Sequence, residues 1–144
     1  MNELSSSRIA VGVELWSERA RPLIHSAAAF AGQFATSWLA IAVSDSTHAL
    51  SLLTPEERQR VRENTELVMS LGGAPFFCEG DDVAQMLLTA AATNGVKLLI
   101  LGQPRERGIF SRIFGHEIST KVLHRAANVW VMFAAYPDIH AASR

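Results

Sequence analysis

The stretch GDDVAQMLLTAAATNGVKLLILGQPR, residues 80–105, contains one complete helix-to-strand unit of this chain. Its leading GDD sequence supplies a turn and a helix cap, and an alanine- and leucine-rich segment follows. The NG pair at 94–95 is a typical helix end, because glycine tolerates the left-handed backbone of a C-cap. The apolar run at 96–101 has the length of a buried strand. These residues predict a helix over 83–93 and a buried strand directly after it.

The same two patterns alternate along the rest of the chain. Short apolar or β-branched runs predict strands at residues 8–14, 38–44, 74–79, 96–101 and 128–133. Apolar residues spaced three and four apart predict helices at residues 17–35, 54–71, 83–93 and 117–125. Helical connections between buried strands imply a single α/β domain, a doubly wound parallel sheet with helices on both faces. Ligands of such sheets bind at the carboxyl ends of strands, here in the loops after the first and fourth strands.

The predicted helices differ in how clearly their ends are marked. Thr54, Pro55 and Glu57 form a strong helix start, with an N-cap, a proline in the first turn and a capping box. Pro22 conflicts with a helix over 17–35, because proline inside a helix removes a donor and clashes with the preceding turn. That helix is therefore irregular before Pro22 or begins later than residue 17. Residues 45–53 predict a polar, mobile loop.

Composition limits the class of protein. The chain has 144 residues, 49% of them hydrophobic and 19% charged, which is typical of one globular domain. Thirteen basic and 14 acidic residues give a net charge of −1, which argues against a nucleic-acid-binding protein. The sequence has no apolar stretch long enough to cross a membrane and no signal-peptide pattern, so we expect a cytoplasmic protein without direct membrane insertion. We expect residues 8–134 to form the domain, with a disordered N-terminus at 1–7 and a flexible tail at 135–144.

Several α/β chemistries leave no trace in the sequence. The glycine-rich turn of dinucleotide-binding folds, the phosphate loop of nucleotide hydrolases and the nucleophile elbow of α/β-hydrolases are all missing. No activated nucleophile, base-orienting pair or metal cluster is visible, so we expect the domain by itself not to be an enzyme. Cys78 lies in an apolar strand and is interpreted as an unreactive buried thiol. Trp16 follows the first strand, where it either packs in the core or stacks on a bound base.

The loop after the fourth strand is the most informative for function. Gly102 ends the strand, and Gly115 stands just before the next predicted helix, whose free N–H groups favour an anion. Five basic and two acidic residues between 103 and 125 give a local charge of +3. Phosphate is the natural ligand for glycines and arginines in this arrangement. The alternative is that the arginines are solvated and the glycines serve only as turn residues.

The element order and this glycine spacing resemble the universal stress protein family. Its nucleotide-binding members carry G-x-x-G-x9-G-[ST] after the fourth strand. Here Gly102 is followed by Arg105 at the second glycine position, then after nine residues by Gly115, with His116 in place of serine or threonine. The G-x-P-R variant, together with PEERQR at 55–60 and the stretch quoted above, is most similar to the universal-stress-protein-like domain of the KdpD potassium-sensing histidine kinases. The likeness covers roughly residues 8–133.

The resemblance implies a three-layer, adenine-nucleotide-hydrolase-like sandwich with strand order 3-2-1-4-5. It also implies a homodimer paired through the fifth strand, residues 128–133, which would lie at the sheet edge. An adenine nucleotide such as ATP is the implied ligand, with no metal. The family's acidic residue after the first strand is matched here by a glutamate. The residues implied to bind nucleotide or phosphate are Glu14, Gly102, Arg105, Arg107, Gly115, His116 and Glu117.

Three function classes stay open at this point. The first is a regulatory sensor domain of the KdpD type, which would serve signal transduction in a two-component system. The second is a free-standing, ATP-binding universal stress protein. The third is a slow phosphohydrolase, for which the sequence offers no nucleophile. The two departures from the family signature, Arg105 and His116, weaken the case for ATP held in the family's manner.

Overall fold

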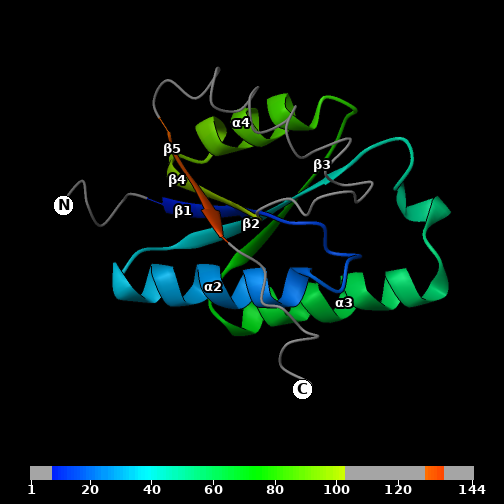
Figure 1. The fold of residues 1–144 in the computed structure, drawn as a ribbon, viewed down its shortest axis with the longest axis horizontal. Helices are drawn as coiled ribbons and strands as arrows, with labels where there is room; N and C mark the ends of the chain where they lie inside the picture. The colour runs from blue at the N-terminus through cyan, green and yellow to red at the C-terminus, as the bar shows by residue number, and fades with distance from the viewer. Residues whose placement is uncertain (1–7, 103–128, 135–144) are drawn as a thin grey trace.

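The computed structural model describes residues 8–102 and 129–134, and these form one parallel five-stranded sheet in the order β3-β2-β1-β4-β5 (Figure 1). The strands are β1 (Arg8–Gly12), β2 (Trp38–Ser44), β3 (Ala74–Glu79), β4 (Val96–Gly102) and β5 (Trp130–Ala134). All four strand pairings are parallel. The predicted fold class and strand order are therefore confirmed, with β3 and β5 at the two edges.

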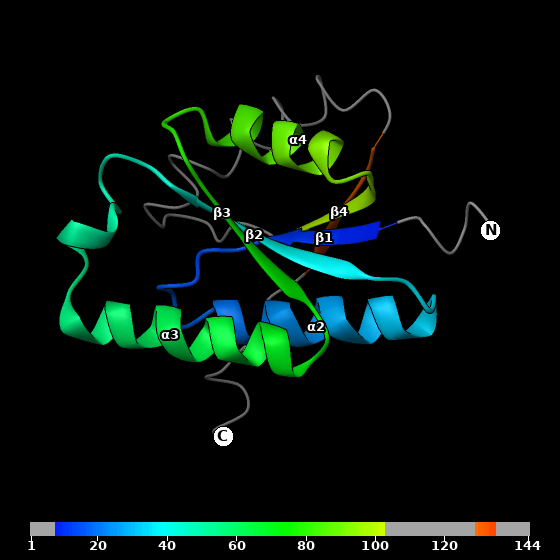
Figure 2. The same ribbon diagram turned by 180° about the vertical axis from the view of Figure 1, so that it is seen from behind.

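Helices cover both faces of the sheet. Helices α2 (Ala20–Gln33) and α3 (Pro55–Ser70) lie side by side on one face, and α4 (Val83–Thr93) lies on the other (Figures 1 and 2). A short 3-10 turn, η1 (Leu50–Leu52), precedes α3. Among the residues that the structure describes, no helix combines the length and the apolar character needed to cross a bilayer.

The core has two halves because successive side chains of a strand point to opposite faces of the sheet. Ile100 packs with Ile24 of α2 and Val68 of α3, and all three side chains are fully buried. Its neighbour Leu99 points to the other face and packs against Leu87 of α4. This alternation explains why the inner strands are apolar along most of their length rather than at every second residue.

Local signals account for the helix ends. The Thr54 hydroxyl accepts the Glu57 N–H at 3.1 Å, and the Glu57 carboxylate accepts the Thr54 N–H at 2.9 Å, which confirms the predicted capping box. Helix α2 begins at Ala20 rather than near residue 17. Pro22 therefore stands in its first turn, where a backbone N–H would have no partner within the helix, and the conflict disappears. Gly95 ends α4 with a φ of +68°.

Two expectations about the ends of strands need correction. The first strand was expected at 8–14 but ends at Gly12, so the chain has already left the sheet when it reaches Glu14. The fifth was expected at 128–133 and occupies Trp130–Ala134.

Residues 45–53 are not simply a mobile loop, because Asp45 accepts the N–H groups of Thr47 at 3.0 Å and His48 at 2.9 Å, and η1 follows. The predicted helix at 117–125 lies outside the described residues.

Candidate functional site

The carboxyl ends of β1 and β4 lie side by side at the centre of the sheet. Gly12 pairs with Leu101, and the strand order reverses here, because β1 is followed by β2 on one side while β4 leads to β5 on the other. Glu14 stands two residues beyond β1, and Gly102 is the last residue of β4. Two of the residues predicted to bind phosphate or nucleotide thus reach the same edge, at the kind of switch point where α/β sheets hold ligands.

Glu14 is the titratable group with the largest change at this edge. Burial raises the pKa of Glu14 to about 7, and Asp45 adds to that effect. The nearby His48 and Arg19 act in the opposite direction without cancelling it. A carboxyl group with this pKa exchanges its proton near neutral pH, so its charge responds to any cation, anion or hydrogen-bond donor that enters the site.

A stacked pair of rings lies near Glu14. The Trp16 indole and the His48 imidazole lie with centroids 4.6 Å apart and planes 11° from parallel. The His48 Nδ1 atom is 3.0 Å from a carboxylate oxygen of Asp45. Hydrogen bonds from Thr47 and His48, with the nearby imidazole, outweigh burial and lower the pKa of Asp45. Trp16 is only 8% exposed and so packs against the protein rather than projecting from it.

The segment after β1 is also held from the side of α3. The buried Asn64 amide donates to the Leu15 carbonyl at 2.9 Å. Arg60 donates to the Trp16 carbonyl at 3.4 Å and to the Glu18 carboxylate at 3.2 Å. These contacts hold the backbone directly after Glu14 against α3.

A cavity of about 360 Å³ opens beside these groups, at the carboxyl ends of β2 and β3. Its walls are largely apolar, with Ser44 and Glu79 as polar exceptions. Its lining consists of Leu15, Trp16, Ala42, Ser44, Leu50, Leu53, Val61, Phe77, Cys78 and Glu79. A mostly apolar cavity with a few polar groups is typical of small-molecule sites. Within residues 8–102 and 129–134, no three His, Cys, Asp or Glu side chains gather in a way that could hold a metal ion.

The remaining predicted site residues, namely Arg105, Arg107, Gly115, His116 and Glu117, lie outside the described residues. Sequence reasoning missed Asp45 and His48, although one signal was present. An aspartate directly after a buried strand, followed by threonine and histidine, often caps a tight turn with its side chain. That turn brings the His48 ring back onto Trp16.

Comparison with known proteins defines the fold class as that of the universal stress proteins. No protein-family profile matches the sequence, and no curated protein matches it significantly. Solved structures do match: a universal stress protein in complex with cAMP has a TM-score of 0.65 at 15% identity, covering 91% of this chain and 98% of its own. A protein from the universal stress protein family of Burkholderia pseudomallei has a TM-score of 0.64 at 21% identity, with coverages of 93% and 98%. The universal stress protein of Archaeoglobus fulgidus in complex with dAMP has a TM-score of 0.53 at 18% identity, with coverages of 88% and 96%.

Proposed function

We propose that this chain is a universal-stress-protein-like regulatory domain that binds an adenine nucleotide at the carboxyl ends of β1 and β4. The observation that carries the proposal is the meeting of Glu14 and Gly102 at the switch point of the sheet. It is supported by two solved structures of the same fold, one a complex with cAMP and the other a complex with dAMP. The domain serves as a sensor of the KdpD type. The second candidate is a free-standing universal stress protein that binds ATP.

The proposal assigns a role to each group by its chemistry. The Glu14 carboxylate accepts hydrogen bonds from ribose hydroxyls or a base amino group. Gly102 has no side chain to hinder a ligand approaching the end of β4. Following the sequence spacing, Arg105 and Arg107 supply positive charge to phosphate, and Gly115, His116 and Glu117 lie around the expected helix N-terminus. No residue in this set is an activated nucleophile, so the domain binds the nucleotide without turning it over.

Homodimer formation through β5 is part of the same proposal. β5 is an edge strand, and Trp130 in it is 80% exposed. An uncovered apolar edge strand favours pairing with a second chain. A dimer paired there would leave the carboxyl ends of β1 and β4 open to the ligand.

Calorimetric titration of AMP, ADP, ATP, cAMP and cyclic di-AMP into the purified chain tests the proposal. We expect modest affinity for at least one of them, and Arg105→Ala should weaken it by about one to two decades. Glu14→Ala should weaken binding as well, whereas Glu63→Ala is a matched control, because that exposed carboxylate lies on α3 and does not line the cavity of the site. Failure of all five nucleotides to bind below the millimolar range would overturn the proposal. Binding that survives both Glu14→Ala and Arg105→Ala would place the ligand elsewhere.

A further inference from the structure

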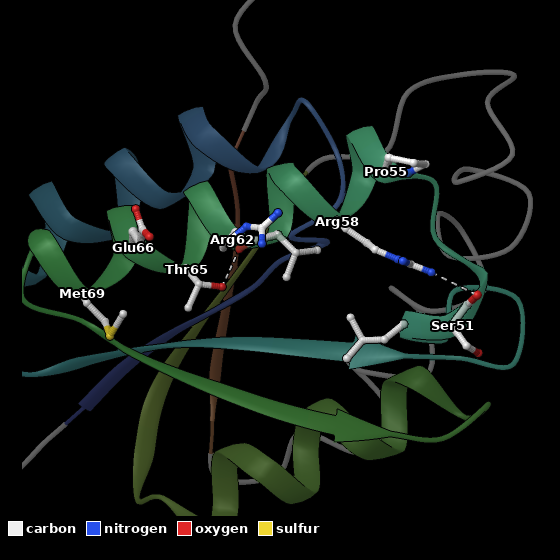
Figure 3. Close-up of a pocket in the computed structure, with 9 residues that line it drawn as sticks. Ser51, Pro55, Arg58, Arg62, Thr65, Glu66 and Met69 are labelled. Carbon is white, nitrogen blue, oxygen red and sulfur yellow. Dashed lines mark hydrogen bonds between the residues drawn. The ribbon is translucent and has the colours of Figure 1, made fainter.

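A second hollow lies between η1 and the outer side of α3 (Figure 3). It has a volume of about 930 Å³. Its lining, which we call the α3 groove, consists of Leu50, Ser51, Pro55, Arg58, Val61, Arg62, Thr65, Glu66 and Met69. The α3 members recur every three or four residues and therefore form one stripe along the helix. From Arg58 to Met69 the stripe is about 16 Å long, or three helical turns.

The groove carries apolar surface that a fully solvated helix face does not need. Leu50 is 64% exposed and Met69 is 54% exposed. Phe77 on the neighbouring edge strand β3 is 56% exposed, and helix α3 packs against that strand. Large apolar side chains thus gather where α3 meets the open edge of the sheet. A concentration of this kind marks a surface that another molecule covers.

The charges of the groove are also incomplete. Arg58 reaches across it from α3 to donate to the Ser51 carbonyl at 3.5 Å (Figure 3). Arg62, one turn further, donates to the Gln59 side chain at 2.8 Å. Among the described residues, neither guanidinium has a carboxylate within ion-pair distance. Each therefore keeps several donors for an acidic group placed beside the apolar stripe.

Two other occupants fit this surface poorly. A second copy packed antiparallel about a two-fold axis would match Arg58 with Glu66 of the other copy. Arg62 lies midway between these two residues, so in such a dimer it would face Arg62 of the second chain. Two like charges would then meet at the axis. An extended strand added to β3 is hindered by Pro75. The N–H groups of successive residues in a strand point alternately to its two sides. The Gly80 N–H points to β2, where it donates to the Ser44 carbonyl, so the backbone nitrogen of Pro75, five residues earlier, faces the open edge and has no hydrogen to donate.

We propose that the α3 groove is a docking site for an amphipathic helix of a partner protein. The helix lays an apolar stripe against Leu50, Val61 and Met69, and carboxylates beside that stripe meet Arg58 and Arg62. A helix of about three turns matches the length of the groove. The groove does not include Glu14 or Gly102, but it shares Leu50 and Val61 with the cavity at the carboxyl ends of β2 and β3.

Two synthetic helical peptides serve as probes. Both carry the same leucine stripe at i, i+3, i+4 and i+7, and its flanks are glutamate in one and lysine in the other. Each is titrated into the full-length, ¹⁵N-labelled chain, and amide shifts are followed by NMR. We expect saturable shifts at Leu50, Arg58, Arg62 and Met69 with the glutamate peptide. The lysine peptide should bind at least about fivefold more weakly.

Charge reversal at the groove provides the decisive variant. Arg58→Glu combined with Arg62→Glu should reverse the preference between the peptides. The control pair Arg21→Glu and Lys97→Glu makes the same change of net charge at exposed positions outside the groove and should leave the preference intact. Equal binding of both peptides, an unchanged preference in the groove variant, or shifts centred elsewhere would each overturn the proposal. Self-association that Met69→Glu abolishes, without peptide binding, would assign the groove to a second copy instead.

Discussion

Replacing Glu14 with glutamine should remove a large part of the pH dependence of stability near neutrality. The pKa of Glu14 is raised from 4.5 to about 7 in the folded chain, chiefly by burial. Between these two values the folded state binds a proton that the unfolded state has released. The free energy of unfolding therefore falls as the pH rises from about 4.5 to about 7, and above that range the full cost of ionising a buried carboxyl is present.

The size of the effect follows from the shift. A difference of about 2.5 pKa units between 4.5 and about 7 corresponds to at most roughly 3 kcal/mol, at 1.36 kcal/mol per unit. Solvent reaching the carboxyl reduces this, so we expect about 1–3 kcal/mol. Glu14→Gln should therefore gain about that much stability relative to the original chain on going from about pH 5 to about pH 8.

Urea unfolding of both chains at several pH values measures this difference directly. The lowered pKa of Asp45 stabilises the fold only as pH rises through the acid range, so this group contributes little change between about pH 5 and about pH 8. Glu63→Gln is the matched control, because it makes the same change at an exposed carboxylate of α3 outside the site and should not reproduce the gain. A stability difference between Glu14→Gln and the original chain that stays constant with pH, or that favours the original chain as pH rises, would refute the argument.

Three further outcomes are expected. Asn64→Ala should cost about 1–3 kcal/mol in urea unfolding, because the buried Leu15 carbonyl loses its partner; a loss below about 0.5 kcal/mol would show that water replaces the amide. Burial raises the pKa of the Cys78 thiol, so a thiol reagent should react slowly with the folded chain and quickly in denaturant, and rapid labelling of the folded chain would contradict this. Trp130→Glu, on the exposed edge strand β5, should convert a homodimer to a monomer in sedimentation experiments, and an unchanged dimer mass would exclude pairing through β5.

Much of the architecture is written in local patterns. The alternation of apolar runs with three- and four-residue spacing predicts the strands and helices, and the capping box at Thr54 marks the start of α3 correctly. The strand order came with the family resemblance, and the structure confirms it. These features depend on neighbours within a few residues, or on a connection rule that holds for nearly all parallel sheets, so they can be inferred without coordinates.

The chemistry of the site depends on contacts that no local pattern contains. The sequence alone placed Glu14 and Gly102, 88 residues apart, on one edge, but it could not give the pKa of Glu14. That value is set by burial and by the charges of Asp45 and His48, about 30 residues away. The stacking of Trp16 on His48 has the same origin. Desolvation and pairing of charges depend on three-dimensional packing, and only the tertiary structure determines which side chains are buried together.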